Sequence, residues 1–251
     1  MVRIVMVGAI CLSLLTSVSF ASLNPHPSGT QAVLTKIRRD LKSRTKPSFE
    51  FLLKRWEADY GTGAVDPLLV VAQDVESPDT DRYIALMGAA KLGGPANAQR
   101  ILPYLKDRSW MIRSGALKAL SALRDQKSYT EILPLLQDKA LVVRLQAVET
   151  VAQLNPPGSA RALTDTLFRA ENYHGGKAQW IPQKALAALR AMKAKEVAPR
   201  LMSLLNYNSD PSLQRQALLT LSELTGRPMP SAKPLAYQIQ EFKTNLKSAQ
   251  K

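Results

Sequence analysis

Residues 107–123 read DRSWMIRSGALKALSAL, and residues 138–154, 31 positions further along the chain, read DKALVVRLQAVETVAQL. Both stretches begin with an aspartate, which an arginine follows six residues later and an alanine three residues after that. Apolar residues then stand at i, i+1, i+4 and i+7 counted from the alanine, which places them on one face of a helix. A chain in which the same helix recurs at a fixed interval is built from repeated units.

Five copies of this helix can be aligned on their alanine. A second apolar stretch precedes each copy, so the unit is a helix, a short turn and a second helix. One such pair cannot bury both of its apolar faces, whereas five stacked pairs form a continuous core. The sequence therefore predicts an all-α protein, a right-handed α-solenoid of about five helix pairs. The aligned alanines are Ala85, Ala116, Ala147, Ala185 and Ala217.

The segments on either side of the repeats differ from them, as terminal caps do. Amphipathic helices are predicted at residues 30–43 and 48–60, and a further one follows a linker that is rich in helix-breaking residues. The chain thus divides into a signal peptide (1–21), a basic N-terminal helical cap (22–63), the repeats (64–225), and a linker with a C-terminal capping helix (226–251).

Residues 1–21 have the pattern of a secretory signal peptide, with a positive charge at Arg3, an apolar run of 12 residues, and small residues Ser19 and Ala21 before a cleavage site. The run is too short to span a bilayer comfortably. Cys11 lies within it and is the only cysteine, so the exported chain has no disulfide, and no Asn-x-Ser/Thr sequence occurs. These features favour the bacterial periplasm.

The chain is strongly basic, with 34 lysines and arginines against 20 acidic residues. Without Arg3, which belongs to the signal segment, the balance is 33 against 20, a net charge of +13. Such a charge favours acidic partners or anionic surfaces. A periplasmic location argues against nucleic acid as the partner.

The helix-pair period, the pairs Asp107–Arg113 and Asp138–Arg144, and the ALKAL type of second helix resemble HEAT repeats. The resemblance is greatest to the short bacterial kind related to the phycobilin-lyase group, and it covers about residues 64–225. It implies a curved scaffold that binds other proteins. Lyase activity would rest on this resemblance alone, because fold does not imply function.

The resemblance also implies a ladder in which arginines pair with acids of the neighbouring turns, because buried charges are normally paired. Repeats four and five carry Pro182 and Gln214 at the arginine position, with Gly176 and Asn208 at the acid position, so these repeats are expected to lack the pair. The residues given this structural role are Arg82, Asp107, Arg113, Asp138 and Arg144.

The sequence contains no recognisable catalytic or metal-binding motif. His26 and His174 are the only histidines, so no zinc site of ordinary ligand count can be built. H-E-x-x-H, G-x-S-x-G and Walker sequences are absent. The acidic run at 74–81 lacks a calcium-loop pattern, and acids at a helix start explain it better. We therefore expect no enzymatic activity, no cofactor and no metal.

The fourth repeat is longer than the others, because its alanine follows the previous one after 38 residues instead of 31. The extra residues lie in the segment 170–180, AENYHGGKAQW, whose double glycine predicts a mobile or sharply turned loop. Tyr173, His174 and Lys177 suit either a contact with a partner or a tolerated insertion. Trp180 is a further candidate contact, although a core position is the stronger interpretation.

Two other surfaces are candidate binding sites. The first is a basic N-terminal segment, which suits anionic headgroups, an acidic protein or a polyanion, or is simply a solvated helix face. The second is the row two positions after each aligned alanine, whose mixed character suits a protein better than nucleic acid. The candidates are Lys36, Arg38, Arg39 and Lys42 in the first surface, and Met87, Lys118, Glu149 and Leu219 in the second.

We therefore expect non-catalytic binding of another envelope protein along the curved surface. An electrostatic binder of anionic envelope polymer or lipid is one alternative, for which steep salt dependence would speak. A lyase-like or cofactor-handling enzyme subunit is the other, for which a cluster of perturbed titratable groups in a deep groove would speak.

Overall fold

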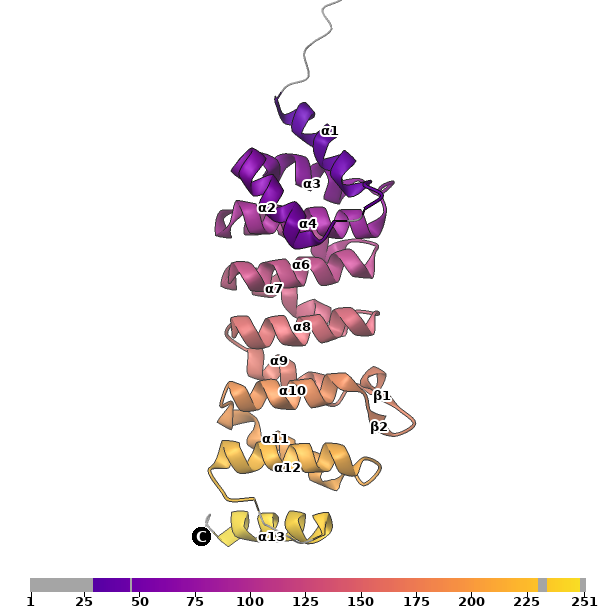
Figure 1. Ribbon diagram of the computed structural model, residues 1–251. Coiled ribbons are helices and arrows are strands. Elements are labelled where there is room, and N and C mark those ends of the chain that lie inside the picture. Colours follow the sequence, from indigo (N-terminus) through magenta and orange to yellow (C-terminus); the bar gives the residue numbers. More distant parts are fainter. Residues whose placement is uncertain (1–28, 46, 230–233, 249–251) are drawn as a thin grey trace, which may run out of the picture.

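The structure is a computed structural model that describes residues 29–45, 47–229 and 234–248. Helix pairs stack in chain order from one end of the molecule to the other, so that the molecule is an elongated α-solenoid (Figure 1). The all-α solenoid predicted from the repeat pattern is confirmed. The predicted signal peptide at 1–21 and His26 lie outside the described residues.

Each of the five repeats consists of a first and a second helix, and the second helices pack side by side along one face (Figure 1). The second helices are α4 (Asp79–Gly93), α6 (Trp110–Leu123), α8 (Leu141–Leu154), α10 (Trp180–Ala191) and α12 (Pro211–Thr225). The first helices are α3 (Val65–Gln73), α5 (Ala98–Ile101), α7 (Tyr129–Ile132), α9 (Ser159–Thr166) and α11 (Ala198–Leu201).

In three repeats the first helix changes to a 3₁₀-helix after about one turn. Pro103 and Pro134 lie in two of these 3₁₀ segments, where each removes a donor from the helical ladder. The third segment contains no proline, so the tighter turn does not depend on proline alone. The three segments are η3 (Leu102–Lys106), η5 (Leu133–Gln137) and η8 (Met202–Asn206). Shorter 3₁₀ turns connect other elements: η1 (Gly61–Ala64), η2 (Pro95–Asn97), η4 (Gln126–Ser128), η6 (Ala170–Asn172) and η7 (Lys195–Val197).

The aligned alanines mark the closest approach of the second helices. All five are fully buried, and a larger side chain at this position would hold the neighbouring helices apart. Gly115 shows how close the helices come, since a Cβ atom there would lie 2.8 Å from Cδ2 of Tyr83 in the neighbouring helix α4. Small residues at this register therefore let one repeat pack against the next.

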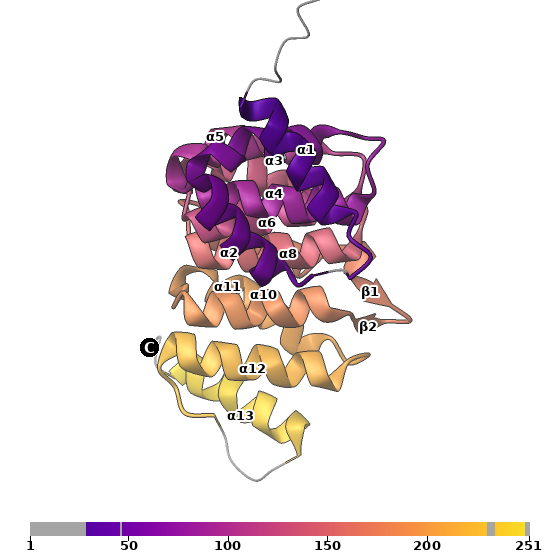
Figure 2. The same cartoon turned by 45° about the horizontal axis from the view of Figure 1, so that its top comes forward.

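Helices α1 (Gly29–Leu41) and α2 (Phe49–Tyr60) cover one end of the stack (Figure 2). Trp56 of α2 is fully buried, and its indole Nε1 donates to Oδ2 of Asp40 at 3.0 Å. The other carboxylate oxygen of Asp40 pairs with Nη1 of Arg55 at 3.1 Å. At the opposite end, α13 (Leu235–Ser248) packs on α12 and buries Ile239 and Phe242.

An arginine–aspartate ladder joins the first three repeats. Arg82 contacts the carboxylate of Asp107 through two guanidinium nitrogens. Arg113 binds Asp138 in the same bidentate way, with Nε–Oδ2 at 2.7 Å and Nη2–Oδ1 at 2.8 Å. Both arginines are buried, and each aspartate also accepts a backbone N–H of its own turn. The ladder therefore fixes successive turns to each other at one edge of the solenoid.

The next step of the ladder corrects the sequence alignment. Arg144 donates from Nε to Oδ1 of Asn172 at 2.9 Å, and Asn172 donates in turn to the carbonyl of Thr166. The alignment had placed Gly176 at this position, four residues too late, because the insertion follows Asn172. In the fifth repeat, Gln214 occupies the arginine position and bonds within its own repeat, to Leu205 and Asn208.

Candidate functional site

Three large apolar side chains are exposed at the starts of three adjacent second helices. Trp110 is the first residue of α6 and is 47% exposed, Val142 is the second residue of α8 and is 46% exposed, and Trp180 is the first residue of α10 and is 63% exposed. The three helices lie side by side in this order (Figure 1). We call these residues the edge row.

The core position expected for Trp180 is wrong. A helical side chain leans toward the N-terminus of its helix, so the first residue of α10 points past the helix end and away from the stack. The same geometry exposes Trp110, which was not among the contacts predicted from the sequence. The spacing to the aligned alanine was a usable signal. Trp110 stands six residues before Ala116, and Trp180 stands five residues before Ala185, so both fall at the start of a second helix.

The insertion in the fourth repeat is a β-hairpin that projects at the start of α10 (Figure 2). Strand β1 (Tyr173–His174) pairs with β2 (Lys177–Ala178) in antiparallel register. Gly175 and Gly176 form a two-residue turn with φ values of 55° and 74°, a conformation that glycine adopts without strain. The backbone N–H of Ala178 donates to Oδ2 of Asp210 at 2.8 Å, which ties the hairpin to the fifth repeat.

Alternation along the strands decides which hairpin residues a partner can reach. His174 and Lys177 form one cross-strand pair and are exposed. Tyr173 is half-buried, where its ring meets that of Tyr207 edge-on at 5.5 Å and its hydroxyl donates to the carbonyl of Leu167. Burial raises the pKa of Tyr173 to about 12. Tyr173 is therefore an internal anchor of the hairpin rather than an exposed contact.

The predicted row of residues two positions after each aligned alanine is only partly accessible to a partner. Lys118 and Glu149 are exposed, Leu219 is half-buried, and Met87 is buried, so the prediction of Met87 as a contact is wrong. The reason is the N-terminal cap: α2 packs against α4, and Trp56 lies against Gly88, the next residue.

The four basic candidates, three in α1 and Lys42 directly after it, are all exposed but are not equivalent. Arg38 pairs with Asp74 at 3.1 Å, and Nζ of Lys36 lies 5.9 Å from the ring centre of Tyr60. Arg39 and Lys42 have no ion-pair partner among the residues that the structure describes. These two cations, at the C-terminal end of α1, are available to an anionic surface.

Two features are absent from the residues that the structure describes. They contain no group of three or more histidine, cysteine, aspartate or glutamate side chains that could hold a metal ion. No described helix is both long and apolar enough to cross a membrane.

A linear stack of helix pairs, in which each repeat packs on its neighbours, defines the class of α-solenoid repeat proteins. Residues 65–152 match the family model of HEAT repeats. The match runs from the start of α3 into α8, so it covers the first three helix pairs, which are similar to HEAT repeats. HEAT repeats generally mediate protein–protein interactions. No curated protein matches the chain significantly.

Proposed function

We propose that this protein is a non-catalytic scaffold of the bacterial periplasm, which binds another envelope protein along the face of its second helices. The edge row is the observation that carries this proposal. Exposed tryptophans are enriched at the energetic centres of protein interfaces, and exposed apolar patches on soluble proteins mark binding sites.

The edge row has the dimensions of a protein contact. Packed helices lie about 8–10 Å apart, so the row from α6 through α8 to α10 extends over about 20 Å. Its side chains begin helices that are packed on both sides, so the backbone loses little freedom when a partner binds. A partner with apolar side chains at a similar spacing would cover all three residues.

Polar groups around the edge row suit the rim of such an interface. His174 and Lys177 project from the hairpin that leads into α10. Further along the second helices, Lys118 is exposed, and Glu149 lies 3.6 Å from Lys184. This surface has both signs of charge, which favours a partner of mixed character over a uniform polyanion.

The location and the closer relationship remain predictions from the sequence. Residues 1–21 support export, and the absence of cysteine from the rest of the chain is compatible with it. The likeness to the short bacterial HEAT proteins of the phycobilin-lyase group supports kinship of fold. It does not carry a lyase activity to this chain.

The test is capture of a partner from envelope extract on the tagged protein, with washes at low and high salt. A W110S/W180S variant removes two exposed tryptophans of the edge row. The matched control, F51S/Y237S, removes two exposed aromatic residues of the caps, which are 57% and 67% exposed. We expect a stoichiometric protein that resists high salt, is lost with the first variant and is retained with the second. Equal retention by both variants would contradict the proposal.

The exposed cations at the C-terminal end of α1 favour a second candidate function, which is binding of anionic envelope polymer or lipid. Arg39 and Lys42 are the residues that would carry it. In the same capture experiment, this function predicts release of polymer or lipid at high salt. It also predicts loss of binding in an R39Q/K42Q variant, with no effect of the W110S/W180S changes.

A further inference from the structure

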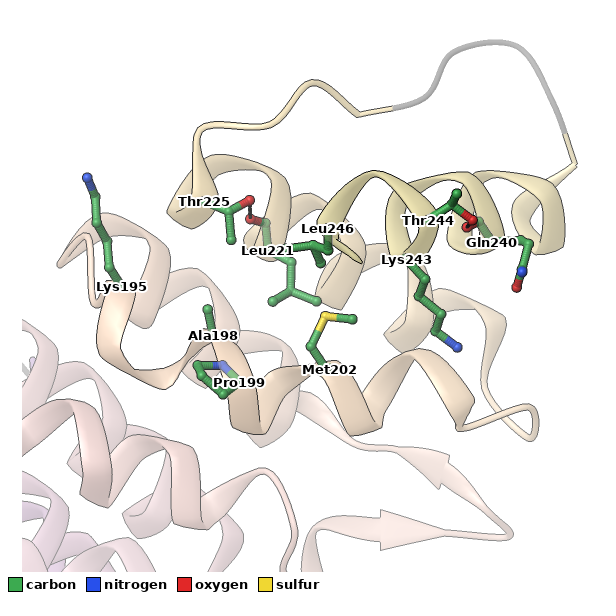
Figure 3. A pocket seen from close by; sticks show the side chains of 10 residues that line it. All are labelled: Lys195, Ala198, Pro199, Met202, Leu221, Thr225, Gln240, Lys243, Thr244 and Leu246. Atoms are coloured by element: carbon green, nitrogen blue, oxygen red, sulfur yellow. Dashed lines mark hydrogen bonds between the residues drawn. The ribbon is translucent and has the colours of Figure 1, made fainter. Parts of the chain in front are cut away.

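A cavity of about 580 Å³ lies between the fifth repeat and α13 (Figure 3). Ala198, Pro199 and Met202 line it from the first helix of the repeat and from η8. Leu221 of α12 and Leu246 of α13 line it from the other side. Its volume falls within the range of about 300–1,000 Å³ that is typical of small-molecule sites.

The middle of the cavity is apolar. Figure 3 shows Met202, Leu221 and Leu246 converging there, whereas the two lysines of the lining lie toward opposite ends. Met202 and Leu246 are only half-buried, although both belong to the layer between the repeat and its cap. An alkyl chain in the cavity would remove this apolar surface from water.

The polar groups of the lining leave positive charge available. Lys195 and Lys243 are the charged residues that line the cavity, and no carboxylate does. Lys243 donates to the amide oxygen of Asn206 at 2.7 Å, a neutral partner that orients the ammonium without cancelling its charge. Thr225 and Thr244 donate their hydroxyls to backbone carbonyls of their own helices. Neither threonine therefore has a free hydroxyl hydrogen for a ligand.

We propose that this cavity binds a free long-chain carboxylic acid. The alkyl chain lies against Met202, Leu221 and Leu246, and the carboxylate binds the ammonium of Lys243, with Lys195 adding positive potential. A carboxylate fits better than a phosphate headgroup, because no arginine lines the cavity to bind phosphate oxygens in a bidentate way. The site lies apart from the edge row, and this proposal does not rest on the scaffold function.

The test is isothermal titration of the purified protein with monomeric dodecanoate. We expect one molecule bound per chain, and at least tenfold weaker binding of both dodecanol and dodecyltrimethylammonium. K243Q should weaken binding of dodecanoate about tenfold, since a hydrogen bond to a charged group is lost. K127Q makes the same change of charge at an exposed residue far from the cavity in sequence, and should leave the affinity unchanged.

Two variants test whether binding occurs in the cavity itself. M202W fills it from the repeat, and T244W fills it from an exposed position of α13, where a large side chain does not disturb the core. Both should abolish binding while circular dichroism stays unchanged. If M202W unfolds the protein, T244W decides. Absence of dodecanoate binding, equal binding of dodecanol, retained binding in T244W, or preference for a lysophospholipid would each overturn the proposal.

Discussion

At the residue scale, the pair Arg113–Asp138 connects two repeats from buried positions. Changing Arg113 to alanine leaves the carboxylate of Asp138 buried without its charged partner, and we expect a loss of about 3 kcal/mol in the free energy of unfolding. Urea unfolding followed by circular dichroism measures this loss. The control R100A breaks an exposed ion pair, in which the side chain of Arg100 is 47% exposed and that of Asp66 is 68% exposed. This change should cost about 0–1 kcal/mol. Equal losses in the two variants would show that the buried ladder pair contributes no more to stability than an exposed pair.

The ladder also makes the protein sensitive to acid. Burial alone would raise the pKa of Asp138, but hydrogen bonds from Arg113 and from the backbone N–H of Ala140 outweigh it and hold this pKa below its usual range. For Asp79, the hydrogen bond from Ser109 is the largest cause of a lowered pKa. Both carboxylates therefore stabilise the fold fully above about pH 4, and this stabilisation is lost as the pH falls through the folded-state pKa.

We accordingly expect the free energy of unfolding to decline between about pH 4 and pH 2. Urea unfolding at a series of pH values measures the slope. An R113M/D138L variant replaces one pair by apolar groups and should show a shallower decline, because one carboxylate with a lowered pKa is gone. A decline of unchanged slope in this variant would mean that other carboxylates carry the acid sensitivity.

Single residues also show how far the sequence can be interpreted. The buried alanines follow from spacing, because they repeat in a fixed register, whereas the ladder that pairs Arg82 with Asp107 and Arg113 with Asp138 is expected from the resemblance to HEAT repeats. Asn172 could not be placed in this way, since the insertion after it displaced the count by four positions. Burial of Met87 could not be foreseen either, because it depends on where the cap helix α2 folds back.

At the element scale, the hairpin depends on its two-residue turn. Gly175 has φ of 55°, and a Cβ atom there would meet nothing within 4 Å, so the cost of a side chain is purely conformational. We expect G175V to cost about 1–2 kcal/mol locally, while G175N should be nearly neutral, because asparagine tolerates this conformation. Faster hydrogen exchange of the Gln179 amide, which donates to Asn172, would report the opening. Equal exchange rates in both variants would count against a strained turn.

The ends of elements are also where sequence patterns say least. The period of the second helices predicts which residues inside each helix are buried. It does not predict whether the first residue of the helix is buried or exposed. The side chain of that residue projects beyond the helix, as those of Trp110 and Trp180 do. Long apolar side chains at such positions resemble core residues in sequence and become surface residues in the folded chain.

At the scale of the whole molecule, a solenoid is held together only by contacts between neighbouring repeats. Buried charged pairs join repeats one to three, whereas at the next junction the buried partner of Arg144 is the neutral amide of Asn172 and the charged pair, Glu149–Lys184, is exposed. Repeat five is joined to repeat four by the hydrogen bond between Ala178 and Asp210 and by two ion pairs that are exposed or partly exposed, Arg200–Asp165 and Arg190–Glu223. Because exposed pairs contribute little, local stability should fall toward the C-terminal end.

Hydrogen exchange followed by mass spectrometry resolves this gradient along the chain. We expect the amides of α6 and α8 to exchange at least about tenfold more slowly than those of α12 at neutral pH, because the last repeats open without the first. The R113A variant should speed exchange in α6 and α8 and leave α12 unchanged, since only nearest neighbours are coupled. Uniform exchange along the chain, or an equal effect of R113A on α12, would show that all five repeats unfold as one unit.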